Sequence, residues 1–307
     1  MKWLIPIESE KDIDEAIEAT KFFPDFISVH QLLLSRKLKL NPGDTCYYYE
    51  DGTSKDRAYM VARKAKYEKV SSQFVVINSK ITAKVDKNNF FEALDELKIV
   101  FPEVFNTIGA AIMCGEPLTD LLGEWYKSRI PDFNLIKGPA CFYYMTEDQK
   151  KKLLDFTKNG LPLAGGYVFD KVDPEKDGEG INNTWTHAKP EDLEITKYKL
   201  IHFSHSLIRL ESTGEAVSYE MSDSGYIHHL YTMPEHRRKG LGDAVEKDIC
   251  TNIIKTGYTP FKAVELFNKA VLASTDRSEF WTKVCFEDGN PVSYYFHFLE
   301  SPELQQH

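Results

Sequence analysis

A basic turn followed by two closely spaced glycines is the part of the sequence whose residue types are best suited to bind a ligand. It runs from Tyr231 to Gly242 and reads Tyr-Thr-Met-Pro-Glu-His-Arg-Arg-Lys-Gly-Leu-Gly. A strand is expected before it and a helix after it. The first turn of a helix has backbone N–H groups without intrahelical partners and carries partial positive charge. Three cations and two glycines at that point predict a site for an anion such as a pyrophosphate.

Two simpler interpretations of this turn stand beside the first. A run such as Arg237-Arg238-Lys239 is usually a solvated charged surface, and Gly-x-Gly is often only a turn. The segment lacks the Gly-x4-Gly-Lys-[Ser/Thr] pattern of a Walker A loop. Val245 stands where the dinucleotide-binding fingerprint needs its third glycine. The turn alone therefore leaves the anion unidentified.

Together with its flanks, the turn resembles the GNAT acyltransferase superfamily. Residues 237–242 match the [Gln/Arg]-x-x-Gly-x-[Gly/Ala] signature of that superfamily. More specifically, the chain is similar to the glycine N-acyltransferase-like branch, with an FR47-like C-terminal domain. The further matches occur in the same order and are the Leu-Tyr-Thr-x-Pro-Glu-His-Arg segment before the signature, Asn183-Thr184-Trp185, Ala216-Val217-Ser218-Tyr219 and the Gly225 turn. The resemblance covers roughly residues 161–290.

This resemblance implies where acyl-CoA, the acyl donor, would bind. It implies that the donor lies between two parallel strands, 226–232 and 259–266, that splay apart in a V. It also implies that Asn268 touches the pantetheine arm, although a helix N-cap is an equal alternative for that residue. The pantetheine would pair with Leu230, Tyr231 and Thr232, and the diphosphate would lie on Arg237, Arg238, Lys239, Gly240, Leu241, Gly242 and Asp243.

The general base is the first departure from the family pattern. An amine acceptor must lose a proton before it attacks the thioester, so a base is expected. Tyr226 occupies the register of the usual glutamate, and a phenol with a pKa of about 10 is a poor base at pH 7. His228 lies two residues on and faces the same side of the strand. We expect His228 to act as base or water relay with Tyr226 as its hydrogen-bonding partner, and His229 to face the other side; the alternative is that His228 is an ordinary strand histidine.

The general acid is the second departure. Residues 280–286 fill the place of a Tyr-x-x-x-Gly-Phe pattern in which the tyrosine reprotonates the leaving thiolate. Trp281 replaces that tyrosine and Cys285 replaces the glycine. An indole N–H donates a hydrogen bond but does not supply a proton usefully. Water, or unaided departure of the thiolate, is expected to suffice, and Cys285 is expected to be a packing residue.

Hydrophobic periodicity predicts the elements that place these residues. In the second half, strands at 205–210, 216–221 and 226–232 form a meander. A helix at 242–256, a strand at 259–266, a short helix at 278–284 and a strand at 291–299 follow. In the first half, helices are expected at 12–22 and 89–99, and strands at 45–49, 74–77 and 137–145. Gly- and Pro-rich segments at 158–166 and 173–180 predict loops.

The domain organisation follows from these breaks and from the resemblance. We expect an N-terminal domain at 1–160 and a C-terminal, acyl-CoA-binding GNAT domain at 161–307. The resemblance implies that the N-terminal domain is a degenerate copy of the same fold. The predicted fold class is α+β, with a mixed α/β sheet in tandem GNAT-like domains.

Composition excludes several classes of protein. The 307 residues are 42% hydrophobic and 28% charged, which is typical of globular proteins. A net charge of −9 argues against nucleic acid as a partner. The five cysteines show neither a disulfide scaffold nor a zinc-binding spacing, and no metal is expected. We expect no membrane span and a cytoplasmic location, although the family resemblance leaves a mitochondrial one open.

The sequence thus predicts an N-acyltransferase that transfers an acyl group from acyl-CoA to the amine of a small molecule or an amino acid. Glycine as acceptor is implied by the resemblance alone. Two alternatives stay open: a CoA-binding module without catalysis, and a protein Nα- or lysine acetyltransferase.

Overall fold

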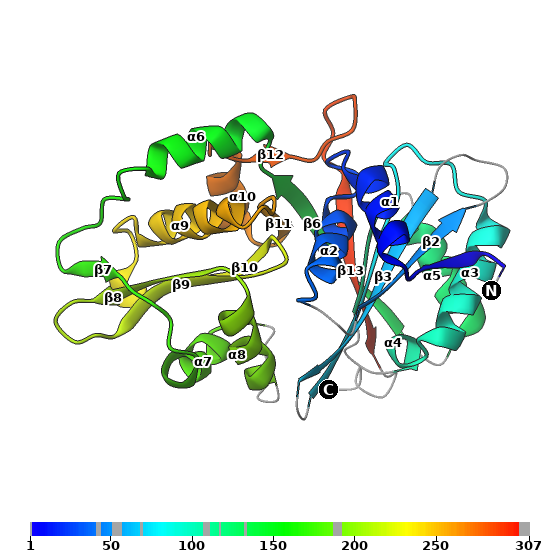
Figure 1. Cartoon of the computed structure of the whole chain (residues 1–307), viewed down its shortest axis with the longest axis horizontal. Helices are drawn as coiled ribbons and strands as arrows, with labels where there is room; N and C mark the ends of the chain where they lie inside the picture. Colours follow the sequence, from blue (N-terminus) through cyan, green and yellow to red (C-terminus); the bar gives the residue numbers. More distant parts are fainter. Residues whose placement is uncertain are drawn as a thin grey trace.

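A single mixed sheet with helices on both faces forms the framework of the protein (Figure 1). The computed structural model describes residues 2–40, 44–50, 57–67, 70–106, 111–116, 118–131, 134–186 and 192–300. Over these residues the strand order is β1-β2-β3-β4-β5-β13-β6-β11-β10-β9-β8-β7, with β12 paired to β6. The predicted class, α+β with a mixed sheet, is confirmed.

The two halves of the chain repeat one order of elements. Each begins with a strand and two helices, continues with three antiparallel strands, and adds a helix and a strand parallel to the third strand of the meander. This repetition confirms the tandem organisation. The first half contains β1 (Leu4–Ile7), α1 (Glu10–Thr20), α2 (Ile27–Lys37), β2 (Asp44–Glu50), β3 (Arg57–Tyr67), β4 (Val70–Asn78), α3 (Lys87–Val100), α4 (Glu103–Asn106), β5 (Ala111–Gly115), α5 (Leu118–Arg129), β6 (Asn134–Tyr144) and α6 (Glu147–Thr157).

The second half follows the same plan after an irregular connection. It contains β7 (Tyr167–Phe169), α7 (Pro174–Asn183), α8 (Leu193–His202), β8 (His205–Leu210), β9 (Ala216–Asp223), β10 (Tyr226–Thr232), the 3-10 turn η2 (Pro234–His236), α9 (Leu241–Lys255), β11 (Phe261–Glu265), α10 (Lys269–Asp276), β12 (Thr282–Lys283) and β13 (Ser293–Glu300). In Figure 1, α6 and α9 lie on one side of β8–β10, and α7 and α8 lie on the other.

The halves exchange their last strands. β6 belongs to the first half in sequence but pairs with β11 of the second half. β13 ends the second half and pairs with β5 of the first half as well as with β6. Hydrogen bonds of the sheet therefore run across the predicted boundary at residue 160, which lies in the irregular connection after α6. The two halves are joined by strand pairing as well as by the linker.

Helix α9 shows why the sequence pattern predicts this part of the fold well. Its apolar stripe of Leu241, Val245, Ile249 and Ile253 is buried against the sheet, as the spacing of three and four residues requires. The helix runs from Leu241 to Lys255, one residue from the expected bounds. None of the described helices has the length and apolar character needed to cross a membrane.

Two predicted elements are wrong. Residues 173–180 were expected to be a loop, but α7 begins there because the Asp173 side chain accepts hydrogen bonds from the N–H groups of Glu175 and Lys176. Pro174 occupies the first helical position, where no N–H is needed. The helix expected at 278–284 is absent, and β12 (Thr282–Lys283) pairs with β6 instead. Such a short apolar run fits a strand as well as a helix.

Candidate functional site

The segment before α9 leaves the start of that helix open. Arg238 has a φ of 61° and Gly240 a φ of 78°, so the backbone passes twice through the left-handed region. Gly240 is the N-cap and offers no side-chain hydrogen bond to the first turn. A Cβ on Gly240 would have nothing within 4 Å. Backbone N–H groups in this arrangement are suited to bind an anion.

Two cations are fixed on either side of this turn. Arg237 Nε donates to the Thr232 carbonyl oxygen at 2.9 Å. Lys239 Nζ donates to the Tyr167 hydroxyl at 2.7 Å. Both side chains remain on an exposed segment. Positive charge is therefore held beside the open helix start rather than dispersed into solvent.

Helix α9 lies against the end of β10 at the second glycine. A Cβ on Gly242 would lie 3.4 Å from Thr232 Oγ1 and 4.0 Å from the Leu230 side chain. A hollow of about 170 Å³ opens beside the same helix start. Its lining includes Phe156, Leu161, Leu163, Lys239, Gly240 and Lys247. The helix start thus faces a space that combines apolar surface with two ammonium groups and the Asp243 carboxylate, which pairs with Lys247.

A wedge opens between β10 and β11. Tyr226 aligns with Phe261, whose N–H donates to the Gly225 carbonyl oxygen at 3.0 Å, and the pairing of these two strands ends there. Beyond this point β10 continues beside β9, and β11 continues beside β6. The splayed parallel strands that the resemblance implies are confirmed. Leu230, 38% exposed, and Phe267, 72% exposed, leave apolar surface where the two strands end.

The equivalent place in the first half is closed. There β4 and β5 stay paired over four residues, from Phe74 with Ala111 to Ile77 with Cys114. The next helix, α3, has a capped start, because the Asp86 carboxylate accepts from the Asn89 N–H at 2.9 Å. A carboxylate at that position satisfies the helix and repels a second anion. The wedge and the open helix start occur together only in the second of the two repeats, over the residues that the structure describes.

A β-bulge in β10 sets the directions of the two histidines. The register against β9 shifts between His228 and Tyr231, and His229 has a φ of 63°. The ring centroids of His228 and His229 lie 5.7 and 6.0 Å from that of Trp185. The two imidazoles therefore share a face with Trp185. The prediction that His229 faces the other side is wrong, because the bulge interrupts the alternation of the strand.

Tyr226 and His228 share a face as predicted, but they stack. Their ring centroids are 5.5 Å apart with an interplanar angle of 27°. Both ring nitrogens of His228 are buried and have no hydrogen-bond partner among the described residues, so the expected hydrogen bond from Tyr226 is not formed. Buried polar atoms without a partner are uncommon. The two nitrogens therefore keep unused hydrogen-bonding capacity.

The pKa shifts of His228 and Tyr226 assign different roles to these two rings. Burial lowers the pKa of His228 well below its ordinary value, Lys199 lowers it further, and Asp223 opposes both. His228 is therefore neutral at pH 7 and has a lone pair that can accept a proton. Burial raises the pKa of Tyr226 above its ordinary value. Its phenol stays protonated, so it donates a hydrogen bond but does not act as base.

The end of α7 forms a wall over these rings. Thr184 Oγ1 lies 2.6 Å from the Tyr219 hydroxyl and 3.2 Å from His229 Nε2. Trp185 follows directly, and Asn183, its neighbour in the motif, is exposed. The motif at 183–185 thus lies on the same side of the sheet as the two histidines.

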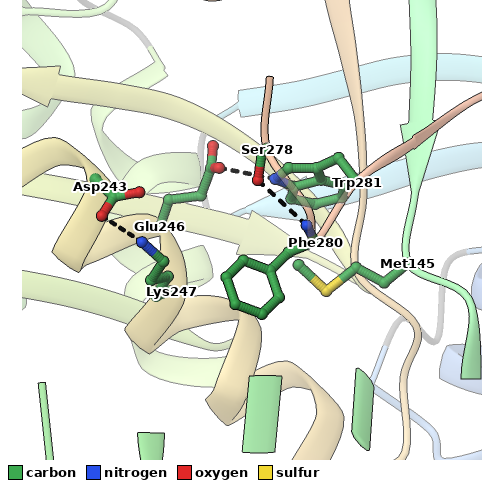
Figure 2. A pocket seen from close by; sticks show the side chains of 7 residues that line it. All are labelled: Met145, Asp243, Glu246, Lys247, Ser278, Phe280 and Trp281. Atoms are coloured by element: carbon green, nitrogen blue, oxygen red, sulfur yellow. Dashed lines mark hydrogen bonds and ion pairs between the residues drawn. The ribbon is translucent and has the colours of Figure 1, made fainter. Parts of the chain in front are cut away.

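The opposite, α9 side of the sheet carries a buried polar cluster (Figure 2). Trp281 Nε1 donates to Glu246 Oε1 at 2.8 Å. Lys262 Nζ donates to Glu246 Oε2 at 2.5 Å. Burial and the nearby Glu246 carboxylate raise the pKa of Glu220 well above its ordinary value. A crevice of only about 10 Å³ remains between α9 and the segment 278–281. Trp281, expected where relatives have an acid, therefore donates its N–H to a carboxylate.

Some site residues could not be found from the sequence. Glu220, Glu246 and Lys262 come from three different elements and share no local motif.

Asn268 is the N-cap of α10, accepting from the Val271 N–H at 3.4 Å, in agreement with the alternative considered for it. Cys285 is exposed, so its expected role in packing is wrong. The described residues contain no group of three or more His, Cys, Asp or Glu side chains placed to hold a metal ion.

Comparison with known protein families finds a match in the second half of the chain, the half that contains the candidate site. Residues 208–287 match the model of the FR47-like protein family. This stretch contains β9, β10, α9 and β11, and the match supports a GNAT-type fold for the second half. No curated protein matches the chain in sequence.

Solved structures extend the similarity to the whole chain. The X-ray structure of a Drosophila protein, a structural genomics target, is 16% identical, covers 96% of this chain and 98% of its own, and has a TM-score of 0.73. At this identity it establishes a shared fold. Two GCN5-related N-acetyltransferases match with a TM-score of 0.45, too low to support an argument. The one from Kribbella flavida is 13% identical, with coverages of 78% and 86%, and the one from Sphaerobacter thermophilus is 11% identical, with coverages of 92% and 88%.

Proposed function

We propose that the protein is an acyl-CoA-dependent N-acyltransferase that acylates the amine of a small molecule or an amino acid. The observation that carries this proposal is the wedge between β10 and β11, which ends at the uncapped start of α9. A pantetheine arm fits a wedge whose two strands no longer pair with each other, and a diphosphate fits the helix N–H groups. The closed first half serves as an internal reference, because it has the same elements without either feature.

In this mechanism His228 takes the proton of the acceptor. The amine enters on the side of Trp185, where both His228 nitrogens are buried without partners among the described residues. His228 is neutral, so it accepts the proton directly or through water. The Asp223 carboxylate favours the protonated form of His228 and stabilises the imidazolium. The freed lone pair then attacks the thioester carbon, and the nitrogen, which becomes cationic as the C–N bond forms, loses its second proton to solvent.

Collapse of the tetrahedral intermediate breaks the C–S bond and releases CoA as a thiolate. Trp281 does not reprotonate it, because its N–H is bound to Glu246 and an indole is not a useful acid. The thiolate therefore leaves unaided or takes its proton from water. The resemblance suggests glycine among the acceptors to test first.

Two measurements test the proposal. Calorimetry with CoA asks whether the wedge binds the donor, and chromatographic detection of free CoA asks whether acyl-CoA and an amine react. Chromatography is preferred to a thiol reagent because the exposed Cys285 would react with the reagent. Binding with turnover supports the proposal, and absence of CoA binding refutes it. Binding without turnover over a panel of acyl donors and amines favours the alternative, a CoA-binding module.

A further inference from the structure

A charge network joins the first half of the chain to the β9–β10 hairpin of the site. Arg63 Nη1 of β3 donates to Asp223 Oδ2 at 2.6 Å, and Lys199 Nζ of α8 lies 3.4 Å from the same oxygen. Arg63 also binds Asp44 of β2, through Nε at 2.9 Å and Nη2 at 3.1 Å. The Arg63 and Asp223 side chains are 8% and 10% exposed. Two cations and two carboxylates thus meet where screening by salt is weak.

Hydrogen bonds from uncharged donors hold the same contact. Ser224 Oγ donates to Asp223 Oδ1 at 2.9 Å, and Ser35 Oγ of α2 donates to Ser224 Oγ at 2.7 Å. The Thr259 N–H, just before β11, donates to Gln31 Oε1 of α2 at 3.2 Å. Elements of the first half therefore fix both the hairpin turn and the point where β10 and β11 begin to separate.

Asp223 is placed next to His228 by the hairpin. Asp223 aligns with Tyr226 across the two strands, so the two residues share a face. His228 is the next residue of β10 on that face, and Tyr226 stacks on it. The Asp223 carboxylate, which Arg63 binds, is therefore a neighbour of the His228 imidazole. His228 is the ring that stacks on Tyr226 and contacts Trp185.

We propose that Arg63 is a positioning residue through which the first half completes the site of the second half. It binds the Asp223 carboxylate and balances the negative charge that His228 meets when it exchanges a proton with an acceptor. The groups that face His228 are Asp223 on β9, Lys199 on α8, and Tyr226 and His229 on β10. Arg63 and Asp44 act through Asp223. The first half, whose own wedge is closed, thereby has a part in the reaction.

The charges make this proposal testable in two directions. Arg63→Met removes one positive charge near His228, which makes its protonation easier. Asp223→Asn removes one negative charge, which makes protonation of His228 harder. A merely structural role would loosen the same contact in both variants and would not displace the titration in opposite directions. Arg63→Lys keeps the charge and is expected to stay close to the wild type.

The experiment follows the histidine ring resonances of the full-length protein by NMR as the pH is varied. The chain has nine histidines, and His228 is identified by the resonance that disappears in His228→Gln. The midpoint for His228 is expected to move up in Arg63→Met and down in Asp223→Asn. The inference rests on the proposed function only for its second readout, which is the acid limb of the pH profile of kcat. That limb is expected to move in the same two directions, with about a tenfold change in rate at a fixed acidic pH for each unit of displacement.

Arg209→Met is the matched control. Arg209 is also 8% exposed and binds two carboxylates, Asp170 at 2.6 Å and Asp177 at 2.7 Å. Its loss is expected to lower Tm without moving the His228 titration. The proposal is overturned if Arg63→Met and Asp223→Asn leave the midpoint unchanged or move it the same way. If Arg63→Met does not fold, the other two variants decide on the proposal. The His228 midpoint must move down in Asp223→Asn and must stay close to the wild-type value in Arg63→Lys. Opposite displacements in a protein that releases no CoA would support the contact while refuting the proposed function.

Discussion

Replacing Gly240 by alanine tests whether the start of α9 binds a diphosphate. Gly240 has a φ of 78°, and a Cβ there would have nothing within 4 Å, so the free protein gains strain without a clash. The left-handed conformation costs a residue with a Cβ about 1–2 kcal/mol. Since 1 kcal/mol corresponds to roughly 2–4 °C in chains of about 150–250 residues, Tm should fall by only a few degrees.

The effect on ligand binding should be larger than the effect on folding. The added methyl group of Gly240→Ala would occupy the open space from which an anion approaches the helix N–H groups. A hydrogen bond to a charged group contributes about 1.5–3 kcal/mol. Losing one such bond weakens CoA binding by about 10- to 150-fold. Calorimetry with CoA measures this change directly.

Gly214 provides a control with matched backbone strain. It has a φ of 72°, a Cβ there would also meet nothing within 4 Å, and it lies in the turn between β8 and β9. Gly214→Ala should therefore lower Tm by a similar amount and leave the Kd for CoA unchanged. Equal CoA affinity in Gly240→Ala and Gly214→Ala would refute the reasoning that places the diphosphate at this helix start.

Three further outcomes are expected. His228→Ala should lower kcat by about 10²–10⁴-fold while the Kd for CoA stays within error, and an unchanged kcat would remove His228 from the mechanism. Affinity for CoA should fall as the salt concentration rises in calorimetric titrations, because Arg237 and Lys239 are exposed; an affinity independent of salt would argue against these cations. Burial lowers the pKa of His30 and of His297 to about 4, against about 6.5 in the unfolded chain. The unfolded chain then binds more protons, so stability is full above about pH 6.5 and falls between about 6.5 and 4, by up to about 3 kcal/mol per histidine. Urea unfolding over this range should show a smaller fall in His30→Gln, and an equal fall would exclude His30 as a source.

The sequence predicted the second half well because local patterns there agree with the fold. The strands at 205–210 and 226–232 have the observed bounds, since alternating side chains and Gly-containing turns specify a meander. The α9 stripe and the Gly240–Gly242 turn are equally local. Segment 173–180 contains conflicting signals: Asp173 and Pro174 are typical of a helix start, whereas Gly178 and Gly180 are typical of a loop. The helix forms because Asp173 caps it.

Features that depend on partners far apart in the chain were decided by the tertiary structure alone. The bulge that turns His229 toward Trp185 follows from the register between β9 and β10, and one extra residue reverses the face of every side chain after it. Arg63 and Asp223, 160 residues apart, meet only because the halves are joined in one sheet.

Residue types and their spacing predicted which helix start is suited to an anion and which strand carries the histidines, because these properties depend on a few neighbouring residues. The strand exchange between the halves is a property of the assembled sheet. So is the difference between a closed wedge in the first half and an open one in the second. Strand pairing over long distances depends on packing across the whole molecule, and no local pattern in the sequence records it.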